Sequence, residues 1–166
     1  MSAPLILSAR FDAEAEAWLE GLRRAHFPPE RNLIPAHVTL FHALPGAELD
    51  AIAAALAEES AATPESAARI GPPRSLGRGV ALAVEAPVLV QLRARLARRW
   101  AEWLTPQDRQ GWRPHATVQN KVTPEAARAL LATLRAEREA RVLGLRLWHY
   151  RGGPWEAAGE FAFTPS

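Results

Sequence analysis

The feature that most constrains this chain is an internal repeat. A shift of 78 residues superposes its two halves without a gap, so that His37-Val38-Thr39-Leu40 falls on His115-Ala116-Thr117-Val118 and Leu22 falls on Trp100. Two copies are too few to stack into a solenoid, in which each unit contacts only its neighbours. The repeat therefore predicts two similar lobes that face each other, with matched strands lining a cleft between them.

Each copy has the pattern strand–helix–strand–helix–strand. Alternating apolar residues predict strands and apolar residues at helical spacing predict helices, while Asp12 and Thr123-Pro124 are typical helix starts. We expect strands at 5–11, 36–44, 67–72, 79–86, 114–122, 142–150 and 157–163, and helices after Asp12, around 49–56, over 88–104 and after Thr123.

These elements predict an α+β fold of two pseudo-symmetric lobes around a central cleft, each an antiparallel sheet packed with two helices. A length of 166 residues suits a single domain. We therefore expect one domain, residues 1–166, with an internal duplication of about 1–78 and 79–166.

Composition narrows the class of protein. The chain has no cysteine, which excludes disulfides, thiolate metal sites and cysteine nucleophiles and fits a reducing compartment. No apolar run approaches the roughly 20 residues of a membrane span, and the first eleven residues lack the pattern of a signal peptide. We expect a cytoplasmic monomer with no membrane partner. Residues 1–83 carry a net charge of −3 and residues 84–166 a net charge of +5, which favours an anionic ligand in the second half.

The repeated His-x-Thr pattern places chemistry on both walls of the expected cleft. Residues i and i+2 of a strand share a face, so His37 and Thr39 point one way while Val38 points into the core. His115 and Thr117 follow the same rule. A pseudo-twofold axis between the lobes would bring two imidazoles and two hydroxyls together.

Such a set suits phosphodiester cleavage without a metal. Imidazole titrates near pH 6.5, so one ring can accept a proton while the other donates one. Threonine hydroxyls can donate to the non-bridging phosphoryl oxygens. One His-x-Thr tripeptide alone carries little information, but two at matched positions are far more specific. A zinc site is the alternative, yet no third ligand stands nearby at metal spacing, so we expect no metal and no cofactor.

The segments Arg31–Leu44 and Arg113–Val118 resemble the paired motifs of the 2H phosphoesterase superfamily. The branch that they resemble most is that of the bacterial 2'-5' RNA ligases and RNA 2',3'-cyclic phosphodiesterases. The resemblance extends from Leu5 to Phe163 and implies a bilobal α+β fold, a central water-filled cleft, no metal, and activity on cyclic or 2'-5' phosphodiesters.

By this resemblance, His37 and His115 are catalytic, with His37 as acid and His115 as base in hydrolysis. It also implies that Thr39 and Thr117 bind the phosphate. The chain departs from the family after each motif. Phe41-His42-Ala43-Leu44 stands where Phe-Leu-Gly is common, and Gln119-Asn120-Lys121 where many members have an arginine.

Other residues are candidates for substrate contact. Phe41 and Gln119 share the parity of their motifs and would lie at the floor of the cleft, unless they are ordinary packing residues. Tyr150, Arg151 and Trp155 flank a Gly-Gly-Pro turn, where an aromatic ring could stack on a base and an arginine reach a phosphate; an ordinary turn is the alternative. His42 has the opposite parity and is expected on the core side.

The sequence therefore predicts a metal-independent phosphoesterase that acts on 2',3'-cyclic phosphate or 2'-5' phosphodiester bonds of RNA or nucleotides. Its partners would be an RNA end, a cyclic nucleotide or a related small phosphodiester. Two alternatives remain open: the reverse reaction, which joins RNA ends by a 2'-5' bond, and a nucleotide- or RNA-binding module that has lost turnover.

Overall fold

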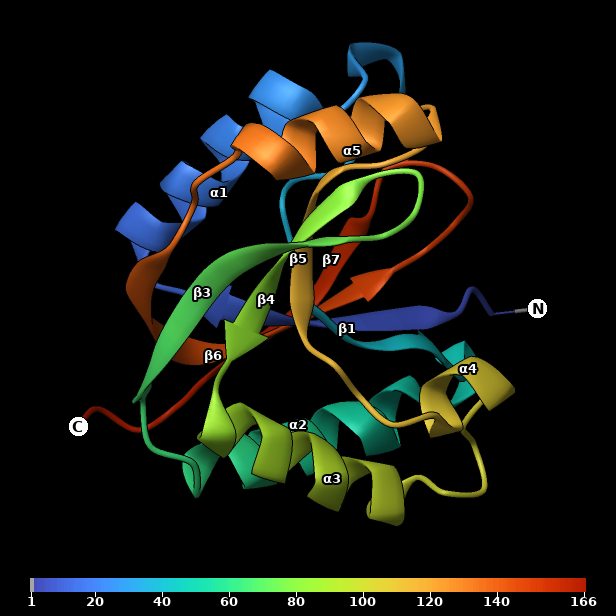
Figure 1. Ribbon diagram of the computed structural model, residues 1–166. Coiled ribbons are helices and arrows are strands. Elements are labelled where there is room, and N and C mark those ends of the chain that lie inside the picture. The colour runs from blue at the N-terminus through green and yellow to red at the C-terminus, as the bar shows by residue number, and fades with distance from the viewer. Residues whose placement is uncertain (1) are drawn as a thin grey trace.

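A single antiparallel sheet joins the two halves of the chain. In the computed structural model, which describes residues 2–166, seven strands pair in the order β2-β1-β6-β3-β4-β5, and β7 pairs with β6 (Figure 1). The strands are β1 (Leu5–Phe11), β2 (Thr39–Leu44), β3 (Ser66–Ser75), β4 (Val80–Glu85), β5 (His115–Gln119), β6 (Arg138–His149) and β7 (Glu156–Ala162). The α-helices are α1 (Ala13–His26), α2 (Leu49–Ala61), α3 (Pro87–Arg99), α4 (Pro106–Arg109) and α5 (Pro124–Thr133).

The strand order reads the same from either end of the sheet. The repeat matches β1 with β4, β2 with β5, and β3 with β6, so β2-β1-β6 is the counterpart of β5-β4-β3. Each half of the chain therefore gives one strand to the other: β6 pairs with β1, and β3 pairs with β4. The expected α+β fold with two pseudo-symmetric lobes is confirmed, and the lobes exchange a strand.

The strand β6 runs through both lobes. One of its edges pairs with β1 from Val142 to His149. The other edge pairs first with β3, from Arg138 to Val142, and then with β7, from Gly144 to His149. Because β7 begins to pair where β3 leaves off, β6 keeps hydrogen-bonded neighbours on both sides, and the sheet continues without a break between the lobes.

The helices are exchanged in the same way. Figure 1 shows α1 and α5 on one side of the sheet and α2 and α3 on the other, so each pair combines the two halves of the chain. Asp12 caps α1 by accepting from the Ala15 N–H, and Thr123 caps α5 by accepting from the Ala126 N–H, as expected. No helix among residues 2–166 is long and apolar enough to cross a bilayer.

The helix expected over 88–104 ends earlier, at Arg99. Trp100 leaves the helical conformation and is buried in the core. Thr105 then caps a new short helix, α4, by accepting from the Asp108 N–H, with Pro106 as its first residue. The chain turns here because a proline disfavours helical geometry in the residue before it.

Both motif strands contain a β-bulge immediately after the His-x-Thr pattern. In β2, Thr39 pairs with Ser8 but Phe41 pairs with Leu7, which leaves Leu40 as the extra residue. In β5, Thr117 and Gln119 pair with consecutive residues of β4, which leaves Val118 as the extra residue. A bulge places two residues opposite one and so interrupts the alternation of side chains.

Because of these bulges, two expectations that rested on simple alternation of side chains are wrong. Phe41 was expected at the floor of the cleft, but it is fully buried in the core with its ring edge-on to Trp100. His42 was expected on the core side, but it is exposed on the cleft side. Gln119, the counterpart of Phe41, is likewise buried, at 8% exposure.

A buried carboxylate fastens the loop around α4 to β2. Asp108 is 1% exposed and accepts hydrogen bonds from the backbone N–H groups of His42 and Ala43 at 2.9–3.0 Å, and from His42 Nδ1 at 3.1 Å. Burial alone would raise the pKa of Asp108, but these hydrogen bonds outweigh it and hold that pKa below its ordinary value.

Two buried arginines bond to the motif strands of the opposite half. Arg93 of α3 donates to the Leu40 carbonyl at 3.2 Å and to the Asp108 carbonyl at 2.7 Å, with its guanidinium 4.4 Å from the centre of the Phe41 ring. Arg23 of α1 donates to the Thr117 carbonyl at 3.1 Å. The helices of each half thereby position the motif strand of the other.

We expect Asp108→Asn to lower the free energy of unfolding by about 1.5–3 kcal/mol, because a neutral amide replaces a charged acceptor of several bonds. At about 2–4 °C per kcal/mol this is a fall of several degrees in Tm. The lowered pKa means that the carboxylate stabilises the fold above about pH 4 and loses this effect as pH falls through its folded pKa. The difference from wild type in thermal unfolding should therefore narrow at acidic pH.

The matched control is Asp50→Asn. Asp50 is exposed in the first turn of α2, where its interaction with the helix end is worth under about 1 kcal/mol. A loss of stability in Asp50→Asn as large as that in Asp108→Asn would contradict the role given to the buried carboxylate.

Candidate active site

One cavity of about 420 Å³ is lined by both motifs. His37 and Thr39 reach it from the start of β2, and His115 and Thr117 reach it from β5. Regular strand geometry begins only at Thr39, but the Val38 carbonyl already accepts from the Ala9 N–H of β1, so the segment before β2 is extended and held in place. The four motif residues that the sequence singled out therefore come together.

The two motif histidines are held in the same way. His37 Nδ1 lies 2.8 Å from the Pro35 carbonyl oxygen, and His115 Nδ1 lies 2.9 Å from the Arg113 carbonyl oxygen. A carbonyl only accepts, so Nδ1 carries the proton in each ring. In the neutral rings Nε2 is then the basic nitrogen, and it remains for a ligand in the cavity.

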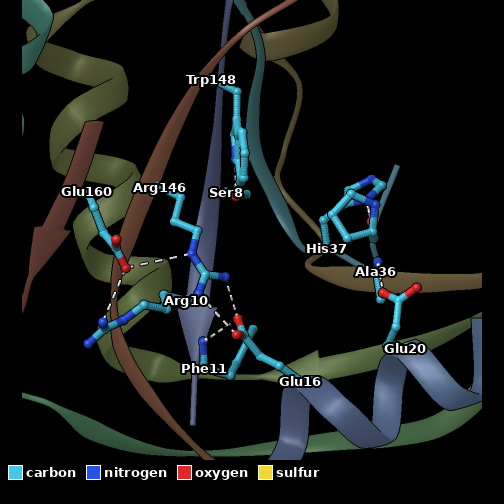
Figure 2. A network of polar contacts seen from close by, with 11 residues as sticks. Ser8, Arg10, Phe11, Glu16, Glu20, Ala36, His37, Arg146, Trp148 and Glu160 are labelled. Carbon is cyan, nitrogen blue, oxygen red and sulfur yellow. Dashed lines mark hydrogen bonds and ion pairs between the residues drawn. The ribbon is translucent and has the colours of Figure 1, made fainter. Parts of the chain in front are cut away.

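Residues around His37 fix its ring from the side of α1 and β6. Its ring centre lies 4.6 Å from that of Trp155, which lies 5.9 Å from that of Trp148. Figure 2 shows Glu20 of α1 accepting from the Ala36 N–H, at 2.8 Å, directly before His37. The backbone that carries the histidine is thus tied to a helix, and its ring packs against an aromatic side chain.

A network of charges lies beside this point (Figure 2). Arg146 of β6 donates to both carboxylate oxygens of Glu16 at 2.7 and 3.1 Å and lies 3.8 Å from Glu160. Trp148 donates from Nε1 to Ser8 Oγ at 2.9 Å. These contacts fasten α1 and β7 to the middle of the sheet, next to the wall that carries His37.

Both catalytic candidates are neutral in the unliganded protein near pH 7. Burial lowers the pKa of His37 to about 4, and the positive charge of Arg23 acts in the same direction. Burial also lowers the pKa of His115, helped by the charge of Arg74. An anion in the cavity would favour the protonated rings and raise both pKa values.

Arg74 competes for the same atom of His115. Its Nη2 lies 3.2 Å from His115 Nδ1, the nitrogen that also faces the Arg113 carbonyl. The guanidinium needs a lone pair on Nδ1, whereas the carbonyl needs a proton there, so only one of the two hydrogen bonds forms at a time. In the tautomer that matches His37, Arg74 has no bond to the ring and can turn toward an anion in the cavity.

The remaining lining residues make the cavity cationic. Arg74, Arg93 and Arg113 all contribute to the wall, whereas Asp108 is the only carboxylate among the described lining residues. Within residues 2–166, the side chains of histidine, aspartate and glutamate form no group of three that could hold a metal ion. The cavity therefore offers three imidazoles, two hydroxyls and guanidinium groups around space for an anion.

Of the other candidates, only Trp155 reaches the cavity. Phe41 and Gln119 are buried in the core because of the bulges. Tyr150 is exposed and does not line the cavity, and Arg151 is engaged by Glu156 across the turn at 2.6 Å. Trp155 therefore lines the cavity, whereas Tyr150 and Arg151, on the other side of the Gly-Gly-Pro turn, do not.

Sequence reasoning did not single out several of the lining residues, among them His42, Arg93 and Asp108. His42 was assigned to the wrong face because its parity was counted through the bulge. Arg93 sits among the charged positions of a helix, and Asp108 lies in a loop without a periodic pattern, so neither gave a signal in the sequence.

Comparisons with known proteins agree with this arrangement. The family model of the 2'-5' RNA ligase superfamily matches residues 11–154. No curated protein matches the chain significantly. Among solved structures, E. coli LigT complexed with 3'-AMP superposes with a TM-score of 0.67 at 20% identity, over 99% of each chain.

Two further crystal structures share the fold. One, described as a phosphoesterase, gives a TM-score of 0.67 at 19% identity over 99% of each chain. The other, TT0787 of Thermus thermophilus, gives 0.63 at 16% identity over 98% of this chain and 99% of its own. At these identities the likeness concerns the fold, while the family model covers most of the sequence. This chain belongs to the 2'-5' RNA ligase superfamily, whose fold is that of the 2H phosphoesterases.

Proposed function

We propose that this protein is a metal-independent phosphoesterase that cleaves 2',3'-cyclic phosphate or 2'-5' phosphodiester bonds of RNA or nucleotides. The observation that carries the proposal is the matched pair of imidazoles in one cavity. Each has Nδ1 against the carbonyl two residues before it, each leaves Nε2 for a ligand, and each has a threonine beside it.

In hydrolysis, one imidazole takes a proton from water as the water oxygen bonds to phosphorus. The bond from phosphorus to a ribose oxygen breaks, and the other imidazole gives that oxygen its proton. The family resemblance assigns His115 as base and His37 as acid. Thr39 and Thr117 donate to the non-bridging oxygens, where negative charge increases in the transition state.

The lowered pKa values fit this cycle if the bound phosphate raises the pKa of the acid, so that this histidine takes up a proton from solvent. His115 is neutral before substrate binds, as a base must be. His37 is also neutral at pH 7, since its pKa is about 4, so an acid at this position must gain a proton in the complex with the anionic substrate. The nearby phosphate charge favours that gain.

The cationic wall and the structural neighbours support a nucleotide substrate. Arg74, Arg93 and Arg113 line the cavity. LigT, which shares the fold, has been crystallised with 3'-AMP and with phosphate. A 3'-nucleotide is one of the two products that opening a 2',3'-cyclic phosphate can give, so this ligand class suits the proposed reaction.

The same groups would support the reverse reaction. In 2'-5' ligation the 5'-hydroxyl of a second RNA end takes the place of water: one imidazole removes its proton as its oxygen bonds to the phosphorus of a 2',3'-cyclic phosphate, and the other imidazole protonates the ribose 3'-oxygen that leaves. The name of the superfamily model makes this the second candidate. The balance between hydrolysis and ligation can be measured directly. The protein is incubated with an RNA 2',3'-cyclic phosphate end and an RNA 5'-hydroxyl end, and the products are separated by length.

We expect His37→Ala and His115→Ala each to lower kcat on a 2',3'-cyclic nucleotide by about 10²–10⁴-fold, the usual effect of removing a positioned acid or base. Thr39→Ala and Thr117→Ala should cost less, because each removes one donor and leaves the proton transfers intact. All assays contain excess EDTA, which should not reduce the wild-type rate. Full activity in either histidine variant would contradict the proposed mechanism.

A substrate with sulfur in place of the leaving oxygen separates the acid from the base. A thiolate leaves without protonation, so such a substrate needs the base and not the acid. We expect His37→Ala to regain most of its lost rate on this substrate and His115→Ala not to. Recovery by His115→Ala instead would reverse the two roles, and recovery by neither would exclude a single-histidine acid.

Anion binding should raise the pKa values of both motif histidines. In NMR titrations without ligand, His37 should titrate near pH 4 and His115 below its ordinary value of about 6.5. Sulfate stabilises the protonated rings, so both pKa values should rise with sulfate, and sulfate affinity should increase as pH falls from 7. The resonances of His26, which lies outside the cavity, serve as the control and should not respond to sulfate.

A further inference from the structure

His42 places a third imidazole in the cavity. Its Nδ1 lies 3.1 Å from an oxygen of Asp108, and a carboxylate that accepts there leaves the proton on Nδ1. The ring lines the cavity with 45% of its side chain exposed, so Nε2 is open to a ligand. No step of the proposed hydrolysis uses this residue.

The carboxylate behind His42 does not compete for an anion's place. One oxygen of Asp108 accepts from the His42 backbone N–H and from its ring, and the other from the backbone N–H groups of His42 and Ala43. Asp108 is 1% exposed, so its carboxylate oxygens are engaged inside the protein rather than turned toward a ligand. Its pairing with Nδ1 instead orients the imidazole toward the cavity, as a carboxylate behind a histidine commonly does.

The charge of the lining exceeds what one phosphodiester requires. The guanidinium groups of Arg74 and Arg113 line the wall beside the histidines, while the third lining guanidinium, that of Arg93, is buried and bonded to the Leu40 and Asp108 carbonyls. A phosphodiester carries a single negative charge. A second anionic group in the same cavity would balance the remaining cationic charge without bringing a carboxylate of the protein against it.

The position of His42 suits a group one ribose away from the reacting phosphate. His42 follows Thr39 by three residues across the bulge, which separates their backbones by about 7–10 Å at the rise of a strand. The spacing is of the order of that between the 3'- and 5'-phosphates of one nucleoside.

We propose that His42, oriented by Asp108, binds a second phosphate of the substrate. The protein would then select a 2',3'-cyclic phosphate whose nucleoside also carries a 5'-phosphate, as the last nucleotide of an RNA does, over a cyclic mononucleoside phosphate. This specificity rests on the proposed function, because it assumes that the reacting phosphate lies between His37 and His115.

Binding without turnover tests the contact directly. We compare the Kd of adenosine 3'-monophosphate with that of adenosine 3',5'-bisphosphate by calorimetry, since the adenine is the same and only the second phosphate differs. A charged hydrogen bond to that phosphate should make the bisphosphate bind about tenfold or more tightly to the wild type. His42→Ala and the bulkier His42→Phe should both lose most of this difference while retaining similar affinity for the monophosphate.

The repeat supplies a matched control. Asn120 occupies the position equivalent to His42 in the second copy but does not line the cavity. Asn120→Ala should keep the preference for the bisphosphate. Thermal unfolding of all three variants establishes that they are folded before their affinities are compared.

Three results would overturn the proposal: no preference for the bisphosphate in the wild type, a preference kept in both His42 variants, or equal weakening of both ligands in those variants, which would indicate a base contact or a structural role.

A kinetic experiment compares adenosine 2',3'-cyclic phosphate with its 5'-phosphorylated form. Selective binding without turnover of either would refute the proposed function and leave the second phosphate site intact. Turnover of both substrates without a His42-dependent preference in Kd or KM would refute the second phosphate site and leave the proposed function intact.

Discussion

The β-bulge directly after the His-x-Thr pattern of each motif strand determines which side chains face the cavity. Because Leu40 is the extra residue in β2, the strand presents Thr39 to the cleft, buries Leu40 and Phe41 in succession, and then returns His42 to the cleft. The side chain of Phe41 supports the guanidinium of Arg93, which bonds back to the Leu40 carbonyl. The local irregularity thus supplies both a cavity residue and the anchor that holds it.

The bulged strands also explain why charged side chains are buried here. Carbonyl groups near a bulge lie where the regular ladder is disturbed, and buried carbonyls need donors. Arg93 and Trp112 donate to the carbonyls of Leu40 and Thr39, and Arg23 donates to that of Thr117. Removing any of these donors would leave an unsatisfied group beside the motif residues, so the positions of the motif histidines depend on side chains from distant segments of the chain.

Much of this arrangement could be read from the sequence. The repeat offset predicted paired lobes and a shared cavity for His37 and His115, and the caps at Asp12 and Thr123 were predicted from single residues. These features rest on local patterns or on similarity within the chain. The bulges do not, because apolar Leu40 and Phe41 suit a bulged strand and a regular one equally well.

Contacts between distant segments were equally hidden. The Asp108 carboxylate contacts the backbone of His42 only because α4 packs on β2. No pattern in the sequence of either segment predicts that the two lie together. The turn at 150–155 showed the same limit: composition indicated an aromatic residue for the cavity, but only the fold distinguishes Trp155, which lines it, from Tyr150, which does not. Pairings of this kind depend on tertiary geometry rather than on periodicity.

The strand order, which reads the same from either end of the sheet, also shows how two separate half-chains could form the same sheet. Two separate copies of one half would build the same six-stranded order as a closed homodimer, with the twofold axis between β3 and β6, as isologous association requires. In that dimer every substitution would be made twice, and the two walls of the cavity would stay identical. Covalent joining releases the copies from this constraint, and the pair formed by His42 and Asn120 shows the release: the same bulge now carries an imidazole in one wall and an amide outside the cavity in the other. Because the proposed reaction needs one proton donor and one proton acceptor, a single chain whose two walls can differ suits it better than a dimer of identical halves.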